Sequence, residues 1–267
     1  MYFSINDASY WYEVHGDGIP LVMLHGFTGS TVTWKQFIAK REKGIKIITI
    51  DLPGHGKTQT PSPKSMEACC TDLMELFNHL QLNTFHLLGY SMGGRTALSF
   101  AMHYPEKVQS LILESASPGL KREKERMQRV EKDESLARMI ESEGLDSFIH
   151  FWEGIPLFDS QKNLSKKQQE AVRMERLSQT AQGLTQSLHA MGTGAQPSWW
   201  GMLHQIMIPV LLLVGAYDSK FIQINSGMKD LLPNSHFEVI EDAGHAIHVE
   251  QSDIFGKMVN GFIFSSC

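Results

Sequence analysis

The chain has 267 residues, of which 42% are hydrophobic, and its formal net charge is −5. This length can bury a full core, and an acidic chain lacks the field that attracts nucleic acid or an anionic membrane surface. Since no basic segment followed by an apolar run opens the chain, and no stretch of about 18 apolar residues occurs, we expect a soluble cytoplasmic protein with no nucleic-acid or membrane partner.

Short β-rich runs bounded by turn residues recur along the chain. They are PLVMLHG (20–26), IKIITIDLPG (45–54), FHLLGYS (85–91), SLILESASPG (110–119), PVLLLVGAYD (209–218) and HFEVI (236–240). Stretches of helical length, such as 66–80, separate several of these runs. Continuous apolar runs that alternate with helices predict an α/β fold with a mostly parallel sheet covered on both faces.

The alternation stops between residues 121 and 196, where no apolar strand-like run occurs. That segment is charged and favours helix, and the strand pattern resumes at 209. We expect a helical lid inserted at about 121–196 over the carboxyl end of the sheet, within a single domain spanning 1–267. Glu125, Arg129 and Asp133 stand at i, i+4 spacing, which a solvated helix with weak ion pairs would also explain.

The three cysteines form neither a disulfide framework nor a metal site by their spacing. Cys69 and Cys70 are adjacent, and Cys267 is the last residue. We expect free thiols in a reducing compartment. Neither a metal nor an organic cofactor is expected, because no cluster in the sequence has the spacing to hold one.

A serine stands between glycines in GYSMG, residues 89–93. A strand leads into Gly89 and a helix-compatible segment follows Gly94, which is the strand–turn–helix context of a nucleophile elbow. There the flanking glycines allow close approach, and a strained backbone exposes Ser91 at the sheet edge. The alternative is a glycine-rich helix start with a capping serine.

A serine hydroxyl needs a base, and the base needs a carboxylate that orients it. Asp218 directly follows the buried strand at 209–217, and His245 follows the last strand by a short turn. The order Ser91, Asp218, His245 is the chain order of catalytic triads in α/β hydrolases. The sequence therefore predicts these three residues as a catalytic triad.

Other acids and histidines compete for these roles. Glu241 and Asp242 stand before the turn, where we expect solvent exposure, and His248 falls in the first turn of a helix. His25 and His55 lie in the loops HGF and PGHG, where histidines organise turns more often than they catalyse. We prefer Asp218 and His245 over all five.

Developing negative charge needs hydrogen-bond donors, and backbone amides suffice. The turn after the strand at 20–24 offers the amide of Phe27, and the residue after the serine, Met92, offers the other. We expect these two amides to form an oxyanion hole.

The motifs LHGF (24–27), DLPGHG (51–56) and GYSMGG (89–94), with Asp218 and His245, resemble the α/β-hydrolase superfamily over nearly the whole chain. Within it, GYSMGGR, LILESASPGL and GAYDSKF are similar to the 2-succinyl-6-hydroxy-2,4-cyclohexadiene-1-carboxylate synthase family of menaquinone biosynthesis. The resemblance implies a lyase whose triad removes a proton from 2-succinyl-5-enolpyruvyl-6-hydroxy-3-cyclohexene-1-carboxylate and expels pyruvate.

Two other readings stay open, because a fold does not determine a function. The same triad serves carboxylesterases and carbon–carbon bond hydrolases, which work through an acyl-enzyme or related triad chemistry. A binding protein without catalysis would not need all three triad members.

The implied substrate is a small polycarboxylate, which an acidic protein must meet with local guanidinium groups. Arg95 stands one helical turn after Ser91, where its side chain would reach the mouth of the site. The resemblance adds Arg129 and Arg176, both in the lid. Each arginine could instead be a solvated charge, and the register within the lid stays open because further arginines lie close by, at Arg122, Arg126 and Arg173.

The resemblance also assigns substrate contacts to two aromatic residues, Tyr90 beside the serine and Trp152 in HFWEGIPLF. Either could instead be a packing residue, Tyr90 in the core and Trp152 between the lid and the side chains beneath it. The oligomeric state cannot be inferred from the sequence.

Overall fold

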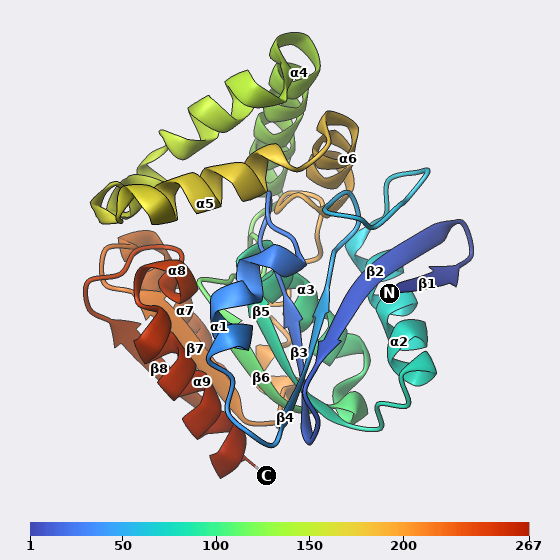
Figure 1. Cartoon of the computed structure of the whole chain (residues 1–267), viewed down its shortest axis with the longest axis vertical. Helices are drawn as coiled ribbons and strands as arrows, with labels where there is room; N and C mark the ends of the chain where they lie inside the picture. The colour runs from blue at the N-terminus through green and yellow to red at the C-terminus, as the bar shows by residue number, and fades with distance from the viewer. Residues whose placement is uncertain (267) are drawn as a thin grey trace.

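The computed structural model describes residues 1–266, and a central sheet of eight strands runs through it (Figure 1). The strands stand in the order β1-β2-β4-β3-β5-β6-β7-β8, and every pair from β4 onwards is parallel. Their bounds are β1 (Tyr2–Ile5), β2 (Ala8–His15), β3 (Ile19–Leu24), β4 (Ile45–Ile50), β5 (Phe85–Tyr90), β6 (Val108–Glu114), β7 (Val210–Gly215) and β8 (Ser235–Ile240). The predicted α/β fold with a mostly parallel sheet is confirmed.

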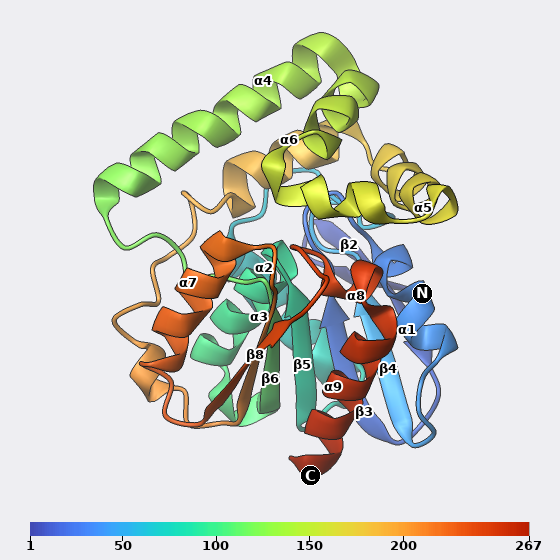
Figure 2. The ribbon, with the colours of Figure 1, turned by 90° about the vertical axis from the view of Figure 1, so that its left-hand side faces the viewer.

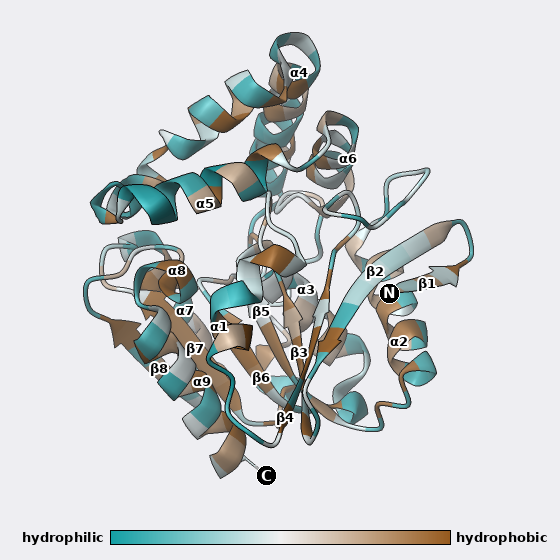
Figure 3. Ribbon diagram, viewed as in Figure 1, coloured by the Kyte–Doolittle hydropathy of each residue, from teal (hydrophilic) through white to brown (hydrophobic). Residues whose placement is uncertain are grey.

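Helices cover both faces of this sheet. One face carries α2 (Met66–His79), α3 (Met92–His103) and α7 (Ser219–Lys229), and the other carries α1 (Lys35–Ala39), α8 (Ile247–Glu250) and α9 (Ser252–Ser265). All six residues of β5 and all six of β7 are consequently buried. This double burial is why these strands are rich in apolar residues, and Figure 3 shows the strands of the sheet largely in brown.

A layer of helices lies over the carboxyl ends of the strands (Figure 2). It consists of α4 (Glu123–Glu153), the 3₁₀ segment η3 (Pro156–Asn163), α5 (Lys166–Leu177) and α6 (Ala181–Met191), and we call it the helical layer. Gly144, with a φ of 84°, divides α4 into two arms. The layer has a small apolar core of its own, formed by Ala137, Ile140, Phe148, Ile149, Leu184 and Leu188.

Polar contacts from α5 attach the helical layer to loops at the carboxyl edge of the sheet. The Glu175 carboxylate accepts hydrogen bonds from the Ser30 amide at 2.9 Å and the Thr33 hydroxyl at 2.6 Å. Two residues past the end of α5, the Gln179 side-chain oxygen accepts from the Gly56 amide at 2.9 Å. These bonds cross more than 120 residues of sequence, so they fix where α5 sits on the sheet.

Two glycines form a close backbone contact between the helical layer and the rest of the chain. A β-carbon added to Gly183, in α6, would collide with the carbonyl oxygen of Gly54, and one added to Gly54 would collide with the carbonyl oxygen of Gly183. The two backbones therefore meet with no side chain between them.

The two adjacent cysteines are free and buried in the structure. Cys267 lies outside the described residues. Within residues 1–266, no helix combines the length and the apolar character that crossing a membrane requires.

Candidate functional site

Ser91 connects β5 to α3 through a sharp turn. Its φ of 50° and ψ of −106° are unusual for a residue with a side chain, and such strain persists only where the surroundings enforce it. The Ser91 amide donates to the Glu114 carbonyl at 2.9 Å. A β-carbon at Gly89 would collide with the carbonyl of Gly93, so the strand and the helix can meet this closely only because glycine stands there.

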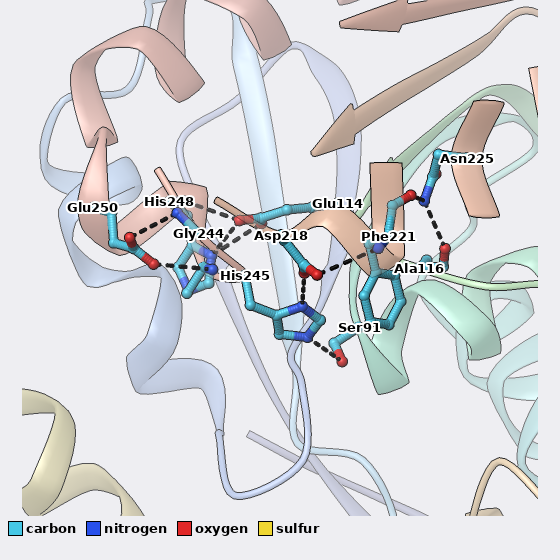
Figure 4. A network of polar contacts seen from close by, with 11 residues as sticks. Ser91, Glu114, Ala116, Asp218, Phe221, Asn225, Gly244, His245, His248 and Glu250 are labelled. Atoms are coloured by element: carbon cyan, nitrogen blue, oxygen red, sulfur yellow. Dashed lines mark hydrogen bonds and ion pairs between the residues drawn. The ribbon is translucent and has the colours of Figure 1, made fainter. Parts of the chain in front are cut away.

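Three side chains from separate elements form one hydrogen-bonded chain (Figure 4). His245 Nε2 lies 3.0 Å from Ser91 Oγ, and His245 Nδ1 lies 2.6 Å from Asp218 Oδ2. Asp218 also caps the N-terminus of α7 and accepts from the Phe221 amide at 3.3 Å. The Phe221 ring packs 4.7 Å from the imidazole. The Asp218 carboxylate and the neighbouring rings thus orient the imidazole, with its other nitrogen at the serine.

A second set of contacts in Figure 4 holds the loop that carries His245. The Glu250 carboxylate accepts from the Gly244 amide at 2.8 Å and from the Ala246 amide at 3.3 Å. His248 Nδ1 lies 2.8 Å from a Glu114 oxygen, and both side chains are buried. His248 is therefore engaged by Glu114 and belongs to the support of the loop.

The other competing residues lie away from the serine or are occupied. Asp242 is exposed and accepts from the Tyr217 hydroxyl at 2.9 Å, while Glu241 is exposed beside it. Burial lowers the pKa of His25 to about 4 and that of His55 to about 3, so both stay neutral near pH 7. His25 Nδ1 lies 2.8 Å from the Gly26 carbonyl and its Nε2 accepts from the Leu52 amide at 2.9 Å, while His55 Nδ1 lies 3.0 Å from the Pro53 carbonyl.

A cavity of about 1000 Å³ opens above Ser91, with walls from the sheet loops and the helical layer. Phe27 and Met92 line it beside the serine. Met92 is the first residue of α3, so its amide has no acceptor within the helix. Phe27 follows β3 in a loop. The structure thus places both residues whose amides were expected to form the oxyanion hole on the wall of the cavity that Ser91 lines.

Arg95 lines the same cavity and is 8% exposed. Its Nη1 donates to the Met191 carbonyl at 2.8 Å and to the Gln196 side-chain oxygen. Both partners are neutral. Burial, followed by the charge of Arg129, lowers the pKa of Arg95 to about 9, so the guanidinium remains cationic at neutral pH. A buried cation with neutral partners favours an anion in the cavity.

Arg129 also lines the cavity, on the first arm of α4. Its Nε donates to Asp133 Oδ1 at 2.8 Å. Asp133 is only 3% exposed, and burial raises its pKa. This i, i+4 pair therefore faces the interior of the site, in contrast to the solvated helix that the spacing alone would allow.

The two aromatic candidates differ in position. Trp152 lines the cavity and packs against Phe27 at 5.5 Å and Phe158 at 5.9 Å. Tyr90 is buried behind the triad, with its ring 5.4 Å from that of His245. The structure places only Trp152 on the cavity wall.

Arg176 likewise lies off the cavity wall. Its guanidinium stacks 4.6 Å from the Phe158 ring centre, donates to the Gln161 side-chain oxygen at 3.1 Å and lies 3.5 Å from Glu153. Burial lowers the pKa of Arg176, and the nearby acids oppose that shift. Arg176 is therefore neither a solvated surface charge nor, in this arrangement, a cavity residue.

Two cations that the sequence did not suggest also line the cavity, Lys132 on α4 and Lys220 at the start of α7. Lys220 stands two positions after Asp218, within GAYDSKF. Because the chain leaves the sheet edge at Asp218, the residues that follow it point to the same region, and this position was the available signal.

The comparisons with known proteins agree with this geometry. The sequence profile of the family described as alpha/beta hydrolase fold matches residues 19–252. A protein of Bacillus subtilis (strain 168), provisionally named 2-succinyl-6-hydroxy-2,4-cyclohexadiene-1-carboxylate synthase, is 45% identical over 92% of this chain and 90% of its own length. A protein of Salmonella agona (strain SL483) with the same name, unqualified, is 31% identical over 86% of this chain and 88% of its own length.

A solved structure described as MenH from S. aureus superposes on this one with a TM-score of 0.92. It is 38% identical and covers 96% of this chain and 98% of its own. The family profile match includes β3 to β8, the loops that carry the three hydrogen-bonded side chains, and the helical layer. The chain therefore belongs to the α/β-hydrolase superfamily and, within it, to the 2-succinyl-6-hydroxy-2,4-cyclohexadiene-1-carboxylate synthase family.

Proposed function

We propose that this chain eliminates pyruvate from 2-succinyl-5-enolpyruvyl-6-hydroxy-3-cyclohexene-1-carboxylate, forming 2-succinyl-6-hydroxy-2,4-cyclohexadiene-1-carboxylate in menaquinone biosynthesis, with Ser91, His245 and Asp218 as the triad. One observation carries the proposal: the hydrogen-bonded chain opens onto a cavity whose wall contains the buried, neutrally partnered guanidinium of Arg95. That combination suits proton removal from an anionic substrate.

In the proposed reaction, Asp218 orients His245 and stabilises its positive charge, and His245 draws the hydroxyl proton of Ser91. The serine oxygen then removes the ring proton next to the succinyl ketone. The enolate oxygen that develops would lie at the amides of Phe27 and Met92. Electrons pass through the ring alkene and break the carbon–oxygen bond of the enolpyruvyl group, which takes up a proton and leaves as pyruvate.

The substrate's carboxylates would meet Arg95 and Arg129, with Trp152 against the ring. Arg176 and Tyr90 remain in the proposal as residues that help to bind the substrate. Arg176 stacks on Phe158, which packs against Trp152, and Tyr90 packs beside His245. In this proposal the segment at about 121–196 is a lid over one catalytic domain.

The proposal places the enzyme in the cytoplasm, acting on a small molecule without a nucleic-acid or membrane partner. Two adjacent buried free thiols suit a reducing compartment, and the net charge of −5 repels anionic surfaces.

The test supplies freshly generated substrate to the purified protein and follows pyruvate and diene absorbance together. We expect equal amounts of both, far above the spontaneous rate. Ser91→Ala should lower the rate by at least about 1000-fold with an unchanged circular dichroism spectrum. Near-normal pyruvate release by Ser91→Ala would refute the triad assignment.

The same preparation is offered p-nitrophenyl acetate. A burst of ester hydrolysis without faster pyruvate release would keep the triad and assign the chain to acyl-enzyme chemistry. Negligible ester turnover beside rapid pyruvate release would support the lyase.

A further inference from the structure

The cavity is richer in positive charge than the proposed mechanism uses. Its cationic wall residues are Arg95, Arg129, Lys132 and Lys220, and its acidic ones are Glu125, Asp133 and Asp218. Two of these acids are already occupied, Asp133 by Arg129 and Asp218 by His245. In a chain whose net charge is −5, the free charge in this cavity is thus positive.

Lys220 and Lys132 are the cations left without a partner. Both side chains are solvent-accessible, and within residues 1–266 no carboxylate lies within ion-pair distance of either ammonium group. The remaining acid of the wall, Glu125, accepts from the amide of Arg122 at 3.3 Å and lies 3.9 Å from its guanidinium. The Lys220 ammonium lies over the ring of Phe221, 5.4 Å from the ring centre.

The two lysines belong to different layers of the molecule. Lys132 is on the first arm of α4, which passes above the start of α7 in Figure 2, and Lys220 is the second residue of α7. Partial burial, then the positive charge of Arg129 and that of Lys132, lower the pKa of Lys220, while Asp218 opposes them. The three cations therefore repel one another across the cavity mouth, and an anion between them would relieve this repulsion.

We propose that Lys220, together with Lys132 and Arg129, binds one carboxylate of the substrate at the cavity mouth, between α4 and α7. This inference rests on the proposed function. Arg95 is carried by α3 and Lys220 by α7, so cationic side chains reach the cavity wall from different elements. A substrate with several carboxylates spread around a ring can use more than one of them, while a simple monocarboxylate ester would use only one.

Lys220→Ala tests the inference, with Lys229→Ala as the matched control. Lys229 is exposed at the far end of the same helix and does not line the cavity. We expect Lys220→Ala to raise KM about tenfold with kcat close to that of the wild type, because a charge-assisted hydrogen bond that is present before and during the reaction contributes uniform binding. Lys220→Arg should recover most of the affinity, and Lys229→Ala should behave as the wild type.

Two kinetic outcomes would overturn the inference. If KM for Lys220→Ala equals that of Lys229→Ala, Lys220 does not bind the substrate. If kcat falls while KM is unchanged, Lys220 acts through the Phe221 ring that packs on His245, and it is a positioning residue.

A binding measurement separates this inference from the proposed function. Calorimetric titration with citrate, a small tricarboxylate, uses no turnover. Weaker citrate binding by Lys220→Ala than by Lys229→Ala, about fivefold or more for one lost ion pair, would support the carboxylate site even if the wild-type chain released no pyruvate. Equal citrate affinity in the two variants would overturn it.

Discussion

At the residue scale, Arg95 holds its charge without an acidic partner of its own. Both recorded hydrogen bonds come from Nη1 and end on neutral oxygens, so the rest of the guanidinium can serve a ligand. Lysine keeps the charge but loses the planar fork. We expect Arg95→Lys to raise KM about 10- to 100-fold, in line with charged hydrogen bonds elsewhere, as measured by initial rates of pyruvate release.

The companion measurement for Arg95→Lys is the thermal midpoint. A buried ammonium that reaches only one of the two acceptors would lower it slightly. An unchanged KM would show that the carboxylates are bound elsewhere in the cavity and would remove Arg95 from the site.

The three hydrogen-bonded side chains could be predicted from the sequence because each follows a recognisable strand and their order along the chain is typical of a triad. The direction in which other side chains point could not be predicted from the sequence. Arg176 stacks on the Phe158 ring and Tyr90 packs beside His245, and neither side chain lines the cavity. Lys220 was missed although it stands two positions after Asp218, because a single lysine at the start of a helix has no distinguishing pattern until the cavity around it is known.

At the element scale, α4 depends on one glycine. Gly144 has a φ of 84° and no atom near its missing β-carbon, so alanine there would cost only backbone strain. We expect Gly144→Ala to lower the free energy of unfolding by about 1–2 kcal/mol, measured by urea denaturation.

Gly261→Ala is the matched control for Gly144→Ala. Gly261 also has open space around it but lies inside α9 without a left-handed φ, so the same substitution should stabilise the chain by about 0.5–1 kcal/mol. An equal change in the free energy of unfolding for the two substitutions would show that the left-handed backbone conformation at Gly144 is not required by the fold.

The attachment of α5 should show in the pH dependence of stability. Burial raises the pKa of Glu175, and its hydrogen bonds to Ser30 and Thr33 only partly oppose this. The folded state therefore binds a proton more readily than the unfolded state does, and stability falls as pH rises from the unfolded pKa of about 4.5 through the raised folded pKa. Glu175→Gln, which keeps the acceptor oxygen, should flatten this decline in urea denaturation.

Glu170→Gln serves as the control for Glu175→Gln, since Glu170 lies exposed on the same helix. Glu170→Gln should leave the dependence of the free energy of unfolding on pH as in the wild type. Parallel pH profiles for all three proteins would mean that Glu175 has the same proton affinity in the folded and unfolded states.

Most of the strands that the sequence predicted are buried on both faces, and the edge strand β8, which is partly exposed, was also predicted. The N-terminal antiparallel pair β1 and β2 was not predicted. In β2 only every second residue is buried, at Ala8, Tyr10 and Tyr12, while Ser9 and Trp11 between them are half-buried. Alternation over so few residues is a weak signal for a strand. In the folded chain, the antiparallel pairing with β4 holds this segment as a strand.

At the scale of the whole molecule, the helical layer and the sheet have separate apolar cores, and Phe27 packs against both the layer's core and one of the sheet's. The layer's core is the smaller. Regions with few buried apolar contacts open more easily than the rest. We expect the amides of α5 to exchange with deuterium about 100-fold faster, or more, than those of β5 and β6.

Hydrogen exchange followed by mass spectrometry would check this, at one pH and temperature for all peptides. Equal protection of α5 and β5 would contradict it and would show that the two layers unfold as one cooperative unit.

The facing glycines at 54 and 183 have a consequence for how the active site could change over time. Because the two main chains are in direct contact there, this contact sets the distance between α6 and the loop that carries Gly54. A methyl group at position 183 would therefore displace α6, which carries the cavity-lining residues Ser187, Leu188 and Met191. Substitution at position 183 would thus change the size of the cavity without changing any residue that lines it.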